Sequence, residues 1–176
     1  MLEKILRVEK TYKGKLLTLI RYRVSIKGLE TIREVVKHPG AVAIIPVKDD
    51  GKIILVKQYR LPVDESLIEV PAGTLKEGEG EEECAKRELL EETGYEASLL
   101  KRIRSVYLAP GYSTEKITLF IARGLNKRSQ KLELDEDIEV LELTPEEVLG
   151  MVKDGTIKDA KTIIGIYDLI RNHSDK

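Results

Sequence analysis

Residues Pro71–Tyr95 decide the fold, and they read PAGTLKEGEGEEECAKRELLEETGY. From residue 80 to residue 93 this stretch is rich in Glu, Lys, Arg and Leu, which favour helices. Gly94 follows directly, and glycine is the residue that most often ends a helix because it adopts a left-handed backbone without strain. The stretch therefore predicts a glycine-rich loop that leads into a strongly acidic helix.

Three glutamates of this helix point to a metal site. Glu88 and Glu92 are four residues apart, so their carboxylates share one face of the helix, and Glu91 borders that face. Like charges at this spacing repel, and a divalent cation removes the conflict, because carboxylate oxygens suit hard ions such as Mg²⁺ or Mn²⁺. The small Ala85 leaves room beside them, and Arg87 is placed to pair with Glu91. For a Glu-rich helix taken alone, a solvated acidic surface is the alternative.

The chain before this stretch predicts a separate small sheet. Residues 3–36 hold several short runs of apolar and β-branched residues, broken by two Lys-Gly pairs, which are typical of antiparallel strands. The His-Pro-Gly segment at 38–40 then interrupts the pattern. We therefore expect two domains, 1–37 and 38–176.

Strands and helices are interleaved in the rest of the chain. The apolar runs AVAIIPV (41–47) and KIILVKQY (52–59) flank an Asp-Asp-Gly turn and predict a β-hairpin. Further strands are expected over 99–108, 116–123 and 138–143, one helix from Thr144 and a last helix over 158–171. Because a regular alternation of strands and helices is missing, the pattern favours an α/β sandwich over a TIM barrel or a Rossmann fold.

Composition excludes several classes of function. The 176 residues carry 30 basic and 31 acidic side chains, so no bulk charge favours nucleic acid or a membrane as partner. The single cysteine, Cys84, cannot form an intrachain disulfide, and we expect it to be a small packing residue. With a charged N-terminus, these features predict a cytoplasmic protein. The 35% of charged residues and the absence of Trp favour a thermophilic source.

The spacing within the acidic stretch resembles the Nudix box. Gly73, five residues, Glu79, seven residues and then the run from Arg87 to Tyr95 match every fixed position of that motif. The resemblance implies a Nudix-like α/β/α sandwich with a mixed sheet, here preceded by the small antiparallel sheet. It also implies Mg²⁺-dependent hydrolysis of a nucleoside diphosphate derivative, in which Mn²⁺ can substitute.

Roles for individual residues follow from the same resemblance. Glu88 and Glu92 are implied as the main metal ligands, with Glu91 close to the metals or the attacking water. The main-chain carbonyl of Ala72 is implied as a further ligand. Structural roles are implied for four box positions: Gly73, Glu79, Arg87 and Gly94.

Residues outside the box resemble the ADP-ribose pyrophosphatase subgroup of the family. Pro110 lies fifteen residues beyond Tyr95, as the proline of that subgroup does. Arg60 ends a Gln-Tyr-Arg run whose arginine contacts the substrate phosphate or ribose in the subgroup, and Arg33 and Glu34 resemble residues that grip the adenosine half. The implied reaction is hydrolysis of ADP-ribose to AMP and ribose 5-phosphate. Subgroup members also pair as homodimers through the N-terminal sheet.

An acidic loop and the identity of the substrate leave alternatives open. Residues 132–138 resemble the loop that supplies the general base or an additional ligand, and Glu136 aligns best, with Glu133 as the alternative. A solvated acidic turn explains the same residues. Another nucleoside diphosphate derivative, such as a nucleotide sugar or a dinucleoside polyphosphate, is a second possible substrate. A Nudix-fold regulator without catalysis is a third reading, although all the box glutamates are present here.

Overall fold

The computed structural model describes residues 3–132 and 137–173. They divide into two units. The first comprises the chain up to Gly40 together with Val106–Lys116, and the second comprises Ala41–Ser105 together with the chain from Ile117 onwards. The expected boundary between two domains, 1–37 and 38–176, stays a prediction.

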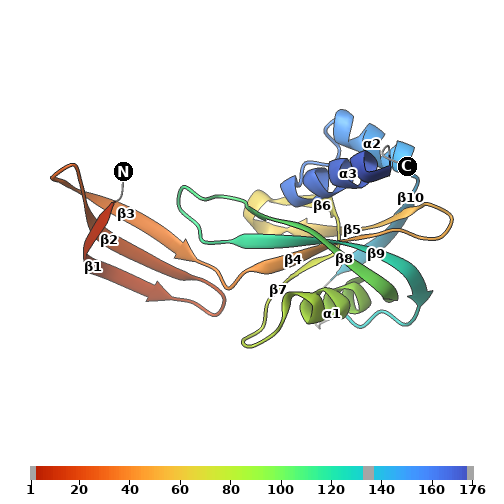
Figure 1. Cartoon of the computed structure of the whole chain (residues 1–176), viewed down its shortest axis with the longest axis horizontal. Coiled ribbons are helices and arrows are strands. Elements are labelled where there is room, and N and C mark those ends of the chain that lie inside the picture. The colour runs from red at the N-terminus through yellow and green to blue at the C-terminus, as the bar shows by residue number, and fades with distance from the viewer. Residues whose placement is uncertain (1–2, 133–136, 174–176) are drawn as a thin grey trace. The chain divides into compact units, whose positions relative to one another are not determined.

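The first unit is built on a three-stranded antiparallel sheet, as the sequence predicts. Its strands are β1 (Lys4–Lys13), β2 (Thr18–Ile26) and β3 (Leu29–Lys37), in the order β1-β2-β3 (Figure 1). The β2–β3 turn places Lys27 and Gly28 at φ of 53° and 83°. Two central residues with positive φ are typical of a type I′ hairpin turn, which matches the twist of the strands it joins.

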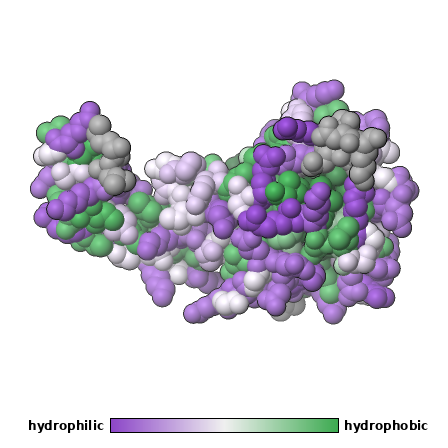
Figure 2. Space-filling view, in the orientation of Figure 1, coloured by the Kyte–Doolittle hydropathy of each residue, from purple (hydrophilic) through white to green (hydrophobic). Residues whose placement is uncertain are grey.

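This sheet buries little of its own apolar surface. Within the three described strands, Ile20 and Val24 alone are buried. Large apolar side chains of the same sheet are exposed: Ile5, Leu6, Val8, Tyr12, Leu19 and Leu29. Figure 2 shows hydrophobic residues gathered over these strands. Many apolar side chains of this sheet are therefore not covered by the described residues of the chain.

A mixed sheet forms the centre of the second unit. It contains β7 (Ala72–Thr74), β4 (Ala41–Pro46), β9 (Lys116–Lys127) and β8 (Tyr95–Tyr107), in that order. Strand β4 runs antiparallel to β7 and parallel to β9. All six residues of β4 are buried, as expected for an apolar run that is covered on both faces.

A second sheet contains β10 (Ile138–Leu143), β5 (Ile53–Arg60) and β6 (Glu65–Glu69), in the order β10-β5-β6. Both pairings are antiparallel. The short 3₁₀ helix η1 (Leu61–Val63) joins β5 to β6. The strand expected over 138–143 is therefore present at the predicted bounds.

The expected hairpin between 41–47 and 52–59 is wrong. The reversal begins as predicted, with a bridge between Val47 and Ile53 and with the Lys48 N–H donating to the Lys52 carbonyl at 2.9 Å. The two strands then enter different sheets. The physical reason is that the apolar strand over 41–46 already has partners along both edges, so a turn signal that predicts a reversal does not decide which strands pair.

Three helices complete an α/β/α arrangement. Helix α1 (Glu81–Thr93) packs on β4 and β7, and α3 (Ala160–His173) packs on β4 from the other side, next to α2 (Pro145–Lys153) (Figure 1). The predicted helix signals are confirmed: Gly94 ends α1 at φ 70°, and Thr144 caps α2 in a capping box. No helix in the described ranges is long and apolar enough to span a bilayer.

One part of the core of the second unit lies between helix α1 and the strands. Cys84 is fully buried in it beside Val42, Ile44 and Leu89. Burial raises the pKa of the Cys84 thiol to about 12. This cysteine is therefore an unreactive packing residue, as expected.

Candidate functional site

The site is organised by a close approach between helix α1 and strand β7. The carboxylate of Glu88, which is 8% exposed, lies directly over Gly73. A Cβ atom on residue 73 would be 1.9 Å from the carboxyl carbon of Glu88, which no two such atoms can tolerate. A side chain at residue 73 would therefore displace the Glu88 carboxylate from this position.

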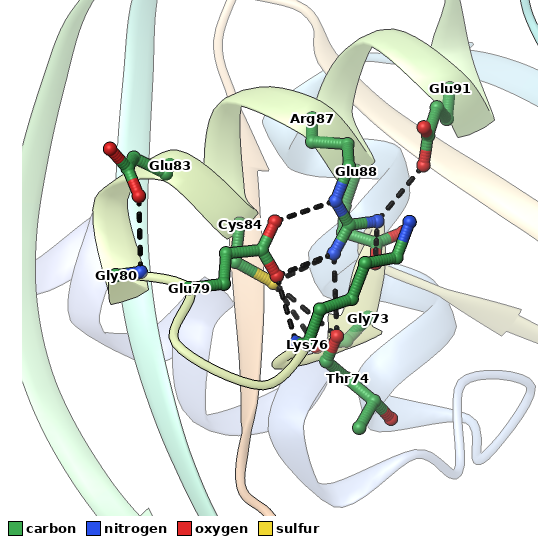
Figure 3. A network of polar contacts seen from close by, with 10 residues as sticks. All are labelled: Gly73, Thr74, Lys76, Glu79, Gly80, Glu83, Cys84, Arg87, Glu88 and Glu91. Atoms are coloured by element: carbon green, nitrogen blue, oxygen red, sulfur yellow. Dashed lines mark hydrogen bonds and ion pairs between the residues drawn. The ribbon is translucent and has the colours of Figure 1, made fainter.

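Arg87 is the centre of the polar network on this side of the helix (Figure 3). Its Nε and Nη2 donate to the two carboxylate oxygens of Glu79 at 2.7 and 2.8 Å. Its Nη1 donates to Glu88 Oε1 at 2.6 Å and to Glu91 Oε2 at 3.0 Å. The expected pairing of Arg87 with Glu91 is thus present, and one guanidinium orients three glutamates.

Glu79 anchors the loop between β7 and α1. The hydrogen bonds from Arg87, and a further one from the backbone N–H of Lys76, lower the pKa of Glu79 to about 2. The same pairing raises the pKa of Arg87 above its usual range. Both groups are therefore charged at neutral pH, and the loop is tied to the helix by a bidentate ion pair.

Glu92 lies one turn beyond Glu88 and is 4% exposed. Its Oε2 accepts a hydrogen bond from the backbone N–H of Ala72 at 3.1 Å. Glu88 and Glu92 thus both face β7, as their spacing predicts, one at Gly73 and the other at Ala72. Two nearly buried carboxylates beside a strand form a strongly negative site that favours cations.

The donor set of this site fits a hard divalent cation. The ligands predicted from the sequence are the carboxylates of Glu88, Glu91 and Glu92 and the main-chain carbonyl of Ala72, and oxygen atoms of these kinds are what Mg²⁺ prefers. Within 3–132 and 137–173, no three Asp, Glu, His or Cys side chains converge as a ready-made metal site. Nη1 of Arg87 donates to both Glu88 and Glu91, so these two carboxylates share one cationic partner in the structure.

Arg60 is held by a partner that sequence reasoning missed. Its Nε and Nη2 donate to the two carboxylate oxygens of Glu69 at 2.7 and 2.8 Å, and Glu69 is 1% exposed. The nearly buried Lys161 donates to the same carboxylate. The hydrogen bonds that Arg60 donates to Glu69 raise the pKa of Arg60, and the charges of Glu92 and Asp159 add to this shift. The negative charge of Glu92 on the acidic helix therefore favours the charged form of Arg60.

The remaining predicted site residues lie elsewhere in the chain. Arg33, Glu34 and Pro110 belong to the first unit, whereas the box belongs to the second. Arg33 pairs with Glu3 at 3.0 Å. The predicted loop residues Glu133 and Glu136 fall outside the described residues.

A second network that the sequence did not reveal lies at the far end of α1. Tyr95, which directly follows Gly94, is 6% exposed and donates from its hydroxyl to Glu142 Oε1 at 2.7 Å. Lys48 Nζ donates to the other oxygen of Glu142 at 2.6 Å. These contacts lower the pKa of Glu142, with Lys48 as the larger cause. They connect the end of the acidic helix to β10 and to the β4–β5 turn.

Comparisons with known proteins agree with this geometry. The NUDIX domain family matches residues 37–164. The ADP-ribose pyrophosphatase of Bacillus subtilis (strain 168) is 44% identical over 170 residues, covering 95% of this chain and 92% of the relative. The methanol dehydrogenase activator of Bacillus methanolicus is 40% identical over the same shares. The GDP-mannose pyrophosphatase of Pectobacterium atrosepticum is 39% identical over 143 residues, 76% of this chain and 74% of the relative.

A solved structure shows the same fold. The crystal structure of an ADP compounds hydrolase superposes with a TM-score of 0.85 and covers 96% of this chain and 92% of its own. The two sequences are 24% identical. The predicted α/β/α sandwich with a preceding small sheet is thereby confirmed.

Proposed function

The chain belongs to the NUDIX domain family, and from this premise we propose that it hydrolyses ADP-ribose to AMP and ribose 5-phosphate. The proposal rests on one observation. The carboxylate of Glu88 lies over Gly73, and Glu92 lies one turn further along the same face of the helix, so the acidic face expected of the box is present. The choice of ADP-ribose is supported by the relative of that activity, to which the chain is 44% identical over 95% of its length.

We propose Mg²⁺ as the cofactor, with Mn²⁺ as a substitute. Glu88, Glu92 and the carbonyl of Ala72 would hold the ion, and Glu91 would lie close to it or to the attacking water. Bound divalent ions polarise phosphoryl oxygens and make water a better nucleophile at neutral pH. Arg87 would keep the carboxylates oriented by moving its Nη1 while Glu79 holds the rest of its guanidinium.

The proton of the attacking water needs an acceptor. Glu136 remains our proposal for this general base, with Glu133 as the alternative, since both follow from the resemblance of the acidic loop. The oxygen of the water forms a new bond to phosphorus while the bond to the leaving phosphate oxygen breaks. The products are two phosphate monoesters.

Arg60 is proposed to bind the diphosphate or the adjoining ribose. A guanidinium fork suits phosphate oxygens, but two of its donors already point at Glu69. Glu69 and Lys161 would thus fix the direction in which the remaining donors point. Arg33, Glu34 and Pro110 are proposed to contact the substrate from the first unit.

A homodimer is part of the same proposal. The sheet of the first unit leaves a row of apolar side chains exposed, and Leu29 is 75% exposed. Pairing of two such sheets would cover this surface, and residues 1–36 would contribute to the partner's substrate pocket. A cytoplasmic location and a thermophilic source also remain proposals from composition.

A nucleotide sugar is the second candidate substrate, because several GDP-mannose pyrophosphatases are 35–39% identical to this chain.

The test compares kcat/KM for ADP-ribose, GDP-mannose and a nucleoside triphosphate, with Glu92→Gln as the inactive control. We expect ADP-ribose to have the highest kcat/KM and AMP to be a product. A higher kcat/KM for GDP-mannose would replace the proposal, and equal turnover by Glu92→Gln would contradict the proposed role of the acidic helix.

A further inference from the structure

A cavity of about 630 Å³ lies in the second unit, away from the residues of the acidic helix. The β4–β5 turn, β9, the start of α2 and the last turns of α3 form its walls. Its apolar lining comes from Val47, Pro145, Leu169 and Ile170. Pockets that bind small organic molecules are about 300–1,000 Å³ in volume, so this cavity has the size of a ligand site.

The charged side chains of the cavity define the ligand it suits. Lys48 and Arg123 contribute two positive charges to the lining, and Asp49 contributes one negative charge. Cations beside an apolar wall favour a molecule with one anionic head and an apolar body, because each part then meets a complementary surface. A neutral apolar compound complements only the apolar wall, and an inorganic anion complements only the cationic side chains, so each should bind more weakly.

Lys48 connects this cavity to the acidic helix. Its ammonium donates to Glu142, and Glu142 accepts in turn from Tyr95, the residue that directly follows the Gly94 cap of α1. An anion in the cavity competes with Glu142 for the charge of Lys48. Without Lys48, one oxygen of Glu142 is no longer held in place, so the carboxylate can shift and take with it the Tyr95 hydroxyl that donates to its other oxygen. Tyr95 directly follows the Gly94 cap of α1, so such a shift acts on the end of the helix that carries Glu92.

We propose that this cavity is a regulatory site for a small organic anion with an apolar body, and that its occupancy lowers turnover through Lys48, Glu142 and Tyr95. Binding at the site is independent of the proposed ADP-ribose activity, whereas its effect on turnover rests on that activity. The two parts are therefore measured separately.

Binding is tested by calorimetry with octyl phosphate and octanoate as probes. We expect both to bind the wild-type protein at least about tenfold more tightly than octanol or inorganic phosphate, since a charge-assisted contact contributes about this factor. Ile170→Trp fills the cavity and Arg123→Gln removes a charge, and each should weaken binding at least about tenfold. Tyr167→Trp adds an indole at a 51% exposed position of the same helix and should bind like the wild type.

Two binding results overturn the site. One is an affinity for octyl phosphate no higher than for octanol or inorganic phosphate. The other is undiminished binding in Ile170→Trp, which would place the probe elsewhere. Neither measurement requires turnover, so a failed ADP-ribose assay leaves the binding result intact.

The regulatory link is tested by turnover at saturating substrate. Octyl phosphate should lower kcat about fivefold or more in the wild type and have no such effect in Ile170→Trp. In Tyr95→Phe the probe should still bind, because Tyr95 does not line the cavity, but its effect on kcat should fall. Inhibition that persists in Ile170→Trp, or binding without any change in kcat, would overturn the link.

Discussion

At the scale of single residues, the tightest constraint in the site is the approach of Glu88 to Gly73. Gly73→Ala puts a methyl group where the carboxylate lies, so we expect Glu88 to be displaced and kcat to fall by about tenfold or more. Gly150→Ala is the matched control, since nothing lies within 4 Å of the added Cβ and alanine favours the helix. Steady-state kinetics and thermal unfolding of both variants check this, and a fully active Gly73→Ala would show that the contact is dispensable.

The paired carboxylates are expected to matter for chemistry rather than for folding. Glu88→Gln and Glu92→Gln should each lower kcat by at least about a hundredfold, since each removes charge from the metal-assisted stabilisation of the transition state. Folding should survive, because repulsion between the carboxylates is relieved. The control is Glu82→Gln, on the exposed side of the same helix.

Kinetics at saturating Mg²⁺, with circular dichroism to confirm folding, separate these outcomes. Near wild-type turnover in both Glu88→Gln and Glu92→Gln would remove the acidic helix from the mechanism.

Arg60 is expected to act on binding. Loss of a charge-assisted contact to phosphate costs about 1.5–3 kcal/mol, so Arg60→Ala should raise KM for ADP-ribose about ten- to two-hundredfold with little change in kcat. Arg60→Lys should recover part of the loss, because a point charge does not reproduce the fork. Lys57→Ala, in the same strand, is the control.

The structure adds a second effect of Arg60→Ala. It leaves the buried Glu69 with Lys161 as its remaining cationic partner among the described residues, so the free energy of unfolding should also fall. Denaturant unfolding measures this separately from KM. An unchanged KM would make Arg60 a structural partner of Glu69 and weaken the ADP-ribose proposal.

At the scale of elements, the ion pair that ties the loop between β7 and α1 to the helix should make the free energy of unfolding depend on pH. The pKa of Glu79 is about 2 in the folded chain, below its ordinary 4.5. A lowered pKa means that the contribution is complete above about pH 4.5 and is lost as the pH falls through 2. Glu79→Gln should therefore be less stable than the wild type at pH 7, and the difference should shrink towards pH 2.

Denaturant unfolding from pH 7 to pH 2 checks this difference. Glu82→Gln should follow the wild type, because an exposed ion pair contributes little. A gap between wild type and Glu79→Gln that is constant over this range would contradict the assignment.

The elements also show which features can be predicted from sequence. The ends of helices were predicted well, at Gly94 and Thr144, because their signals depend on neighbouring residues. Strand pairing was not: a turn signal favoured a β4–β5 hairpin, whereas the pairing is decided by partners far along the chain. The strand expected from residue 99 begins already at Tyr95, directly after the helix.

The same distinction applies to the site. The spacing of Glu88, Glu91 and Glu92 lies within one helix, so their common face was predictable. Glu69 and Glu142 were missed, because their partners are brought to them by folding. The sequence does contain one signal for Glu69, which is a charged residue within the apolar run LIEV. Because a buried glutamate is rarely found without an ion partner, this position predicts a cation beside it.

At the scale of the whole molecule, we expect a dimer through the sheet of the first unit. Light scattering should give twice the 19.9 kDa mass of the chain. Val8→Glu places a charge on the exposed apolar surface and should shift the protein towards the monomer, whereas Leu99→Glu, at an exposed apolar position of β8, should remain dimeric. A monomer that is fully active at assay concentrations would contradict the dimer.

The separation of β4 and β5 into two sheets has a consequence for synthesis on the ribosome. Ala41 pairs with Ile117, and Ile53 pairs with Leu143, so neither apolar strand obtains its full set of neighbours until most of the chain has been translated. Translation proceeds at about 5–20 residues per second, so these two apolar strands stay without their partner strands in the nascent chain for several seconds. Long-range pairing of this kind also slows folding. Chains truncated before β9 should therefore aggregate or engage chaperones, whereas the locally paired β2–β3 hairpin can form as soon as it emerges.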